Sequence, residues 1–200
     1  MAITSAGRRL HHVGLELVLL ASLGCVLGRP GELAADEPSV LRVRSSDASI
    51  TELISLGAER SLTFRNLMAL IQGSDGMVYV ESGACGHGTR ACLKMWMCAR
   101  GSTRFLRVMV NRARGTSDMD LVSSIGHELQ HSVEALSEPA TVDSLGLYNF
   151  FSRTASARND RFETVAAIHA GDAVRRELDA FRERRVQAPL LKSYLVQRAD

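Results

Sequence analysis

The sequence predicts an α+β fold, with a small, mostly antiparallel sheet followed by a central helix and further C-terminal helices. Three observations predict it. Two stretches before residue 73 carry apolar residues at steps of three and four, the spacing of helices that bury one face. Shorter stretches between residues 77 and 110 have the length and composition of strands. Helical spacing returns after residue 120, so strands and helices are segregated along the chain, as in α+β folds.

The first 35 residues have the pattern of an export signal. Arg8 and Arg9 precede a mostly apolar run over residues 13–27. That run has the usual length of a signal-peptide core and is short for a membrane span. We therefore expect a signal peptide over residues 1–35, or an N-terminal anchor if it is not cleaved. A single domain is expected over residues 40–200.

The expected domain begins with scaffold elements. Residues 40–44 alternate between apolar and polar side chains, as in a short strand. Asp47 is placed to cap a first helix, and a second helix is expected to begin at Ser61. A turn over residues 73–76 ends the second helix. Neither helix carries a constellation of catalytic residues.

Three strands are expected next, over residues 77–81, 93–97 and 104–110. A turn at residues 99–102 joins the last two. The sheet must pack the helices in any case. Its edge strand would also allow an extended peptide to pair with it by β-augmentation.

The segment between the first two of these strands contains two cysteines. In an exported protein, Cys85 and Cys92 are well placed to close a short loop as a disulfide. Cys98 would then be left over, although it could replace either partner. The alternative is a second metal site formed by Cys85, His87, Cys92 and Cys98. Their spacing matches no zinc-ribbon pattern, and an oxidising compartment disfavours free thiolates.

The central helix is expected over residues 121–136, with a start at Ser117 and a stop at Pro139. It contains the pattern H-E-x-x-H, from His127 to His131. Residues four apart lie on one face of a helix, so both imidazoles can bind one metal ion. Glu128 lies beside that ion and is suited to act as a general base.

The C-terminal part is expected to hold two helices, over residues 142–152 and from about Arg161 to Arg184, with Pro189 closing the second. A catalytic zinc site needs a third protein ligand, which these helices must supply. Glu163 is favoured, because small residues later in the same helix would allow close approach to the central helix. The same Glu163 also fits a capping box that begins at Asp160.

Three other residues are candidates for the third ligand: Asp143, His169 and Glu177. Asp143 is the runner-up, because some zincins place an Asp ligand soon after the second His. His169 is more typical of a partly buried helix residue. Glu177 lies too far along the helix.

His127-Glu-Leu-Gln-His131, with Glu163 downstream, resembles the gluzincin branch of zinc metallopeptidases. Residues 124–137, with Phe162-Glu-Thr, also resemble uncharacterised bacterial exported proteins. The gluzincin resemblance implies a zincin-like fold, zinc bound by His127, His131 and Glu163, and Glu128 as the base.

The chain departs from the gluzincin pattern at one position. Many gluzincins carry an Asp four residues after the ligand Glu, hydrogen-bonded to a zinc-binding His. Ala167 stands at that position. We therefore expect Asp143 or Asp172 to support the ligands instead. Tyr148 and His169 are the candidates for a donor that stabilises the oxyanion.

These observations predict an exported zinc peptidase that acts on a peptide or protein substrate. The alternatives are a catalytically silent zincin-fold protein that binds zinc or a partner in the cell envelope, and a helical envelope protein with no metal. The formal net charge of +2 leaves no basic footprint for nucleic acid. Membrane contact is expected only through an uncleaved N-terminal segment. The sequence does not determine the oligomeric state.

Overall fold

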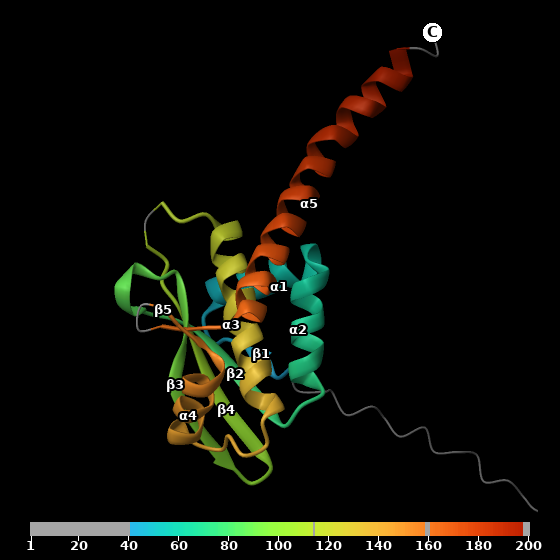
Figure 1. Ribbon diagram of the computed structural model, residues 1–200. Helices are drawn as coiled ribbons and strands as arrows, with labels where there is room; N and C mark the ends of the chain where they lie inside the picture. Colours follow the sequence, from blue (N-terminus) through green and yellow to red (C-terminus); the bar gives the residue numbers. More distant parts are fainter. Residues whose placement is uncertain (1–40, 114, 159–160, 198–200) are drawn as a thin grey trace, which may run out of the picture. The chain divides into compact units, whose positions relative to one another are not determined.

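The computed structural model describes residues 41–113, 115–158 and 161–197 (Figure 1). The predicted signal peptide over residues 1–35 lies outside the described residues. Within the described part, the fold is α+β, as predicted, with five α-helices and a small mixed sheet. None of the described helices combines the length and apolar character needed to cross a membrane.

The sheet has four strands in the order β1-β2-β4-β3, namely Val43–Arg44, Gly76–Ser82, Thr103–Val110 and Ala91–Arg100. Strand β2 runs parallel to both β1 and β4, and only β3 and β4 are antiparallel. The expectation of a mostly antiparallel sheet is therefore wrong. Strands β3 and β4 form an antiparallel hairpin. Strand β4 lies between β2 and β3, so β3 is at the edge of the sheet. The alternation of apolar and polar residues within each strand does not reveal the order of the strands in the sheet.

Helices α1 (Ala48–Arg60) and α2 (Leu62–Gln72) start where the sequence predicts. The Asp47 side chain accepts a hydrogen bond from the Ser49 N–H, and the Ser61 hydroxyl accepts one from the Phe64 N–H. Both helices pack against α3 (Asp118–Ser137) and also contact strand β2, whereas α3 packs against β3 and β4 (Figure 1). Their apolar faces and the sheet form one core, whose largest fully buried side chains include Phe64, Ile71, Leu106, Ile125 and Leu129.

The C-terminal end of α3 is attached to the sheet through Arg104 of β4. This buried guanidinium donates to the carbonyl oxygens of Leu136, Glu138 and Thr141 at 2.6, 2.8 and 3.0 Å. It also donates to the Asp75 carboxylate, with Nη2 2.7 Å from Oδ1. Carbonyl groups at the end of a helix have no partner within it, so Arg104 satisfies them and fixes the helix against β4.

After α4 (Ser144–Thr154), the chain forms a short hairpin of β5 (Ser156–Arg158) and β6 (Arg161–Glu163). Only then does α5 (Val165–Gln197) begin. The predicted helix start at Arg161 is therefore wrong, and Glu163 lies at the end of a strand rather than in the first turn of a helix. Three strand residues are too few for their spacing to be distinguished from the first turn of a helix.

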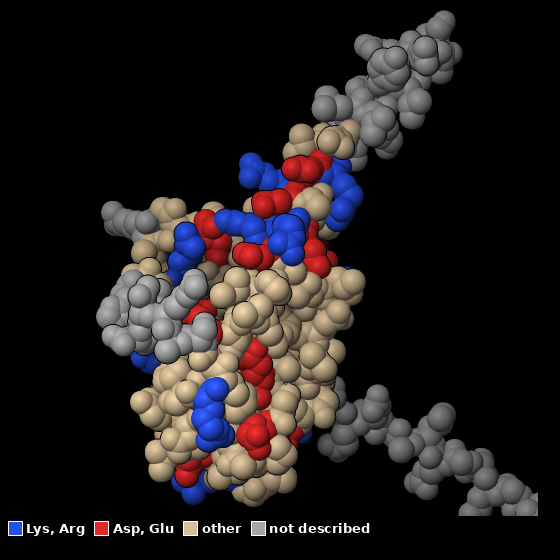
Figure 2. Space-filling model, viewed as in Figure 1, with Lys and Arg blue, Asp and Glu red and all other residues tan. Residues whose placement is uncertain are grey.

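Helix α5 also continues past Pro189 to Gln197. The predicted stop is therefore wrong, because a proline removes one helical hydrogen bond and favours a kink without always ending the helix. On the face shown in Figure 2, acidic and basic side chains are interspersed along the part of α5 that precedes residue 188.

Candidate metal centre

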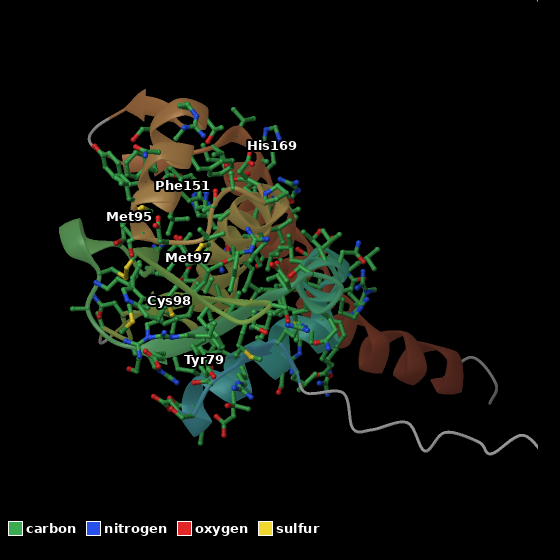
Figure 3. All side chains as sticks on the ribbon, turned by 90° about the horizontal axis from the view of Figure 1, so that it is seen from below. Tyr79, Met95, Met97, Cys98, Phe151 and His169 are labelled. Atoms are coloured by element: carbon green, nitrogen blue, oxygen red, sulfur yellow. A yellow bond between two sulfur atoms is a disulfide. The ribbon has the colours of Figure 1, made fainter. Side chains whose placement is uncertain are left out.

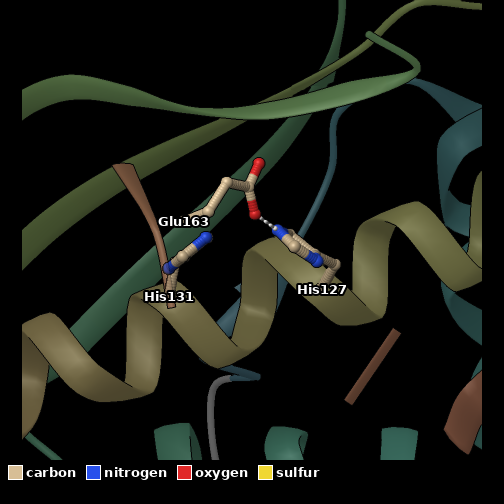
Figure 4. A group of neighbouring side chains, drawn as sticks. All are labelled: His127, His131 and Glu163. Carbon is tan, nitrogen blue, oxygen red and sulfur yellow. Dashed lines mark ion pairs between the residues drawn. The ribbon is translucent and has the colours of Figure 1, made fainter. Parts of the chain in front are cut away.

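Three potential metal ligands converge between α3 and β6 (Figure 4). The carboxylate Oε2 of Glu163 lies 3.1 Å from Nε2 of His127. One donor atom each from His127, His131 and Glu163 lie within 4.8 Å of one another. Imidazole nitrogens and a carboxylate oxygen are donors that zinc prefers, at about 2.0–2.2 Å. The donor types therefore fit a zinc ion, and the most widely separated donor atoms would move closer together to bind it, since two atoms each about 2.1 Å from one ion lie at most about 4.2 Å apart.

Helix α3 places the two histidines one turn apart, as the sequence predicts. Their rings lie edge to face with centroids 4.8 Å apart. The His131 ring also packs edge to face on Phe151 of α4, at 5.2 Å. His131 is buried, whereas His127 is half-buried. Packing on α3 and α4 therefore holds both rings beside one small volume.

Glu163 reaches the histidines from the end of β6, whereas the sequence placed it in a helix. The preceding Phe162 contacts two rings of α4, those of Tyr148 and Phe151, at centroid distances of 5.4 and 6.0 Å. These contacts hold β6 beside α4, whose Phe151 packs on His131. The residue favoured as third ligand is thus brought to the histidines, although by a different element from the one expected.

The expected close approach of the last helix to α3 occurs at Gly171. A Cβ atom added there would lie 3.2 Å from Cβ of His127. The Ser123 hydroxyl donates to the Gly171 carbonyl at 2.9 Å. A larger side chain at this position would push α5 away from the metal centre.

Glu128 lies next to the three ligands and is almost fully buried. Its Oε2 accepts a hydrogen bond of 2.7 Å from the Leu93 N–H of β3. Burial raises the pKa of Glu128, against the opposing effect of the neighbouring His131 and His127. A carboxylate with a raised pKa is suited to accept a proton near neutral pH.

The pKa of His127 is also shifted. Burial lowers it, but the hydrogen bond with Glu163 and the charges of Glu128, Glu163 and Glu134 outweigh burial, so the pKa lies above the ordinary value. The carboxylates around His127 therefore favour a positive charge at this ring. A metal ion would bring such a charge to the same place.

Two cavities meet at Glu128 and Glu163. The larger, of about 530 Å³, also borders His127 and has a polar wall that includes Arg90, Asn111, Thr116, Ser123 and Asp172. The smaller, of about 270 Å³, borders His131 and has an apolar wall of Leu93, Met95, Phe151 and Phe162. Met95 comes from β3 and Phe151 from α4 (Figure 3). A molecule that occupied both cavities would cross the metal centre.

The other candidate ligands are placed elsewhere. Asp143 caps α4, where its Oδ1 accepts a hydrogen bond of 2.7 Å from the Gly146 N–H. Glu177 accepts hydrogen bonds from the Ser61 hydroxyl and the Thr63 N–H at 2.5 and 3.0 Å, at the start of α2. His169 is exposed on α5. In the described ranges, only His127, His131 and Glu163 form a group of this kind.

The predicted disulfide between Cys85 and Cys92 is present, and Cys98 is the free cysteine among the described residues. The disulfide uses two of the four side chains proposed for a second metal site, so that alternative is wrong.

Sequence reasoning missed Glu134, which contacts one of the ligands. Its Oε2 lies 3.2 Å from Nδ1 of His131, and its Oε1 accepts a hydrogen bond of 2.8 Å from the Thr164 hydroxyl. Burial opposes ionisation of Glu134, but these hydrogen bonds outweigh it and lower its pKa. The spacing of Glu134 from His131, three residues along one helix, was a signal that could have identified it.

Glu134 supplies the carboxylate that we expected from Asp143 or Asp172. Asp143 caps α4, and Asp172 lines the larger cavity. Ala167, at the position where many gluzincins have an Asp, is fully buried. Support for His131 therefore comes from its own helix.

Comparisons of the chain with protein-family models, curated proteins and solved structures found no match. The resemblance to gluzincins rests on the motif and on Glu163. Any function must therefore be argued from the geometry of the metal centre.

Proposed function

We propose that the protein is an exported, zinc-dependent peptidase of the gluzincin type with a zincin-like fold. His127, His131 and Glu163 are the zinc ligands, and Glu128 is the general base. The observation that carries the proposal is the convergence of these three ligands beside a buried carboxylate. A zinc ion held there would activate water and polarise a carbonyl group.

Glu128 performs the proton transfers. Its carboxylate takes one proton from the water that attacks the carbonyl carbon of the peptide bond. The same proton passes from Glu128 to the amide nitrogen as the C–N bond breaks. Bond cleavage gives a carboxylic acid, which holds the second proton of the water, and an amine. That second proton then passes to the amine, so the products are a carboxylate and an ammonium group, and Glu128 is again ionised. Its buried position and raised pKa support this role.

The edge strand β3 supports a peptide substrate. The Leu93 N–H points away from β4, because it donates to Glu128, whereas Arg90 faces β4 and accepts from the Asn111 N–H at 2.7 Å. Backbone groups of an antiparallel strand alternate in direction, so Ala91 also presents its backbone at the free edge. An extended peptide that paired there would run past Glu128.

The smaller cavity supports a preference for an apolar substrate side chain. Next to the metal centre, its wall carries the apolar side chains of Leu93, Met95, Phe151 and Phe162, and its volume of about 270 Å³ suits one large side chain. We infer that a substrate places an aromatic or large aliphatic side chain there, next to the bond that is cleaved.

The disulfide supports the proposal of export. Disulfides form and persist in oxidising compartments such as the periplasm and the extracellular space. The Cys85–Cys92 loop borders both cavities through Thr89, so the oxidised form is the one that shapes the proposed site.

A catalytically silent zinc protein is the second candidate. The positions of Tyr148 and His169, the two candidates for an oxyanion donor, favour it. Both are exposed, and neither lines the two cavities. The ligands and Glu128 would then hold zinc, or a protein partner, without cleaving a bond.

The test compares zinc binding and peptide cleavage in the same protein preparations. We expect metal-free protein to bind one zinc ion, and zinc-loaded protein to cleave a broad peptide library read by mass spectrometry. Glu128→Gln should keep zinc and lose cleavage, whereas Glu52→Gln, on an exposed face of α1, should keep both. Cleavage retained by Glu128→Gln would overturn the assignment of the base. Zinc binding without cleavage by the wild type would favour the silent protein.

The third ligand is tested in the same assay. His131→Ala and Glu163→Ala should each weaken zinc binding by at least 10-fold, because each removes one of three ligands. Asp143→Ala is the matched control, since Asp143 was the runner-up ligand and caps α4 instead. Loss of zinc only in Asp143→Ala would overturn the proposed ligand set.

A further inference from the structure

We propose that Glu134 is a positioning residue of the metal centre, which fixes the tautomer and orientation of the His131 ring and links His131 to the segment that carries Glu163. This inference rests on the proposed function, because it assigns His131 as a ligand. Glu134 itself lies outside the ligand set and would contact neither metal nor substrate.

The first part of the inference concerns the His131 ring. Nδ1 lies 3.2 Å from Oε2 of Glu134, and the side chains of His131 and Glu134 are 5 % and 16 % exposed. Water therefore competes weakly for this contact. A carboxylate only accepts hydrogen bonds, so Nδ1 must carry the hydrogen. In the neutral ring, the other nitrogen, Nε2, then has a free lone pair.

That lone pair faces the metal centre. Figure 4 shows a ring nitrogen of His131 directed toward Glu163, and Nδ1 is occupied by Glu134. A histidine ligand needs a deprotonated nitrogen toward the metal, and hydrogen bonding at its other nitrogen selects that state. Glu134 thus prepares His131 for metal binding before a metal arrives.

The second part concerns the other carboxylate oxygen. Oε1 of Glu134 accepts hydrogen bonds from the Thr164 hydroxyl at 2.8 Å and from Nε2 of Gln130 at 3.4 Å. The Thr164 oxygen in turn accepts a hydrogen bond of 3.1 Å from the Ala167 N–H, at the start of α5. Thr164 follows Glu163 directly. One carboxylate therefore connects the helix of two ligands to the end of the strand that carries the third.

The first test reads the tautomer of His131 in the metal-free, full-length protein. Two-bond proton–nitrogen NMR correlations identify which ring nitrogen carries the hydrogen, at a pH above the ring's own titration in the same spectra. We expect the Nδ1–H form in the wild type and a shift toward Nε2–H in Glu134→Ala. A wild-type His131 in the Nε2–H form would overturn the inference. This readout needs no zinc, so it stands even if the proposed function fails.

The second test separates positioning from general structural support. In the wild-type background, Glu134→Ala should weaken zinc binding by about 10–100-fold. In a His131→Ala background, the same change should have a clearly smaller effect, because Glu134 acts largely through that ring. An equal loss in both backgrounds would show that Glu134 only supports the fold and would overturn the inference.

Thr164 provides a matched pair of variants. Thr164→Val keeps the shape of the side chain and removes the hydroxyl, whereas Thr164→Ser keeps the hydroxyl. We expect Thr164→Val to leave the tautomer of His131 unchanged and to weaken zinc binding through Glu163, and Thr164→Ser to restore binding. Equal zinc binding by wild type and Thr164→Val would overturn the link to Glu163.

Discussion

The carboxylate of Glu128, on α3, accepts a hydrogen bond of 2.7 Å from the backbone N–H of Leu93, on the edge strand β3. The contact satisfies an N–H group of β3, which is the edge strand of the sheet formed by the described residues. It also places the proposed base beside the strand that would hold a peptide. One hydrogen bond thus couples the position of the base to the position of the substrate.

The first prediction concerns the cost of burying Glu128. Burial raises its pKa, so the folded protein binds this proton more tightly than the unfolded chain does. Stability conferred by the protonated form is lost as the pH rises from the unfolded pKa through the folded one. At pH 7, metal-free Glu128→Gln should therefore be more stable than the wild type, by about 1 kcal/mol. Urea unfolding with a chelator present measures this difference.

Glu128→Ala should behave in the opposite way. It leaves the Leu93 N–H without its acceptor and opens a cavity, so we expect a loss of about 2 kcal/mol. The advantage of Glu128→Gln over the wild type should shrink as the pH falls toward 4, where the wild-type carboxyl group also becomes protonated. A constant difference across this pH range would contradict the explanation.

Much of the candidate site was predictable because it lies within one helix. The spacing of His127 and His131 determines their shared face wherever the helix packs, and Ser117 marks the helix start as predicted. Gly171 likewise indicated a close helix contact, which the structure contains. Features set by local sequence and helical geometry were therefore recovered.

The features that the sequence did not reveal depend on contacts between distant segments. The position of β4 between β2 and β3 is decided by packing over the whole sheet. The β5–β6 hairpin is stabilised by the packing of Phe162 of β6 against Phe151 of α4. No local spacing in the sequence encodes this contact. The route by which Glu163 reaches the histidines was thus beyond sequence reasoning.

The second prediction tests the apolar cavity. Met95 lines it, whereas the neighbouring Trp96 does not and instead stacks against the Arg107 guanidinium, 5.2 Å from the ring centroid. Met95→Glu would bring a charge into an apolar pocket. If the protein is a peptidase, we expect kcat/KM for peptides with a large apolar side chain at this position to fall by at least 10-fold in the variant. A tenfold fall corresponds to a loss of about 1.4 kcal/mol of transition-state binding.

Trp96→Ala is the matched control for Met95→Glu, because both side chains are similarly exposed, at 41 % and 37 %. The cleavage profile of Trp96→Ala on the same peptide library should match that of the wild type. An unchanged profile in Met95→Glu would show that substrates do not use this cavity.

The third prediction concerns Asp75 and Arg104. The hydrogen bonds from Arg104 are the main cause that holds the pKa of Asp75 below its usual value. This contribution to stability is complete above the unfolded pKa, near 3.8, and is lost as the pH falls through the folded pKa. Asp75→Asn should lower stability at pH 7 by about 1–2 kcal/mol, after allowance for the solvent exposure of Asp75.

Thermal unfolding from pH 6 to pH 2.5 measures this effect. The wild type should lose more stability than Asp75→Asn over the acidic part of the range, so the two curves converge. Glu52→Gln, which alters an exposed carboxylate on α1, should parallel the wild type. Parallel curves for Asp75→Asn would contradict the role of the Arg104 contact.

The last prediction concerns the disulfide that borders both cavities. Cys85 and Cys92 close a loop with a sequence separation of seven residues, and loss of so short a crosslink should lower stability by about 2–3 kcal/mol. Zinc affinity should change little in the Cys85→Ser/Cys92→Ser double variant, because the ligands lie on α3 and β6. KM for peptides should rise, because the loop forms part of both cavity walls. Cys98→Ser controls for the loss of a thiol, and a double variant as stable as Cys98→Ser would contradict the prediction.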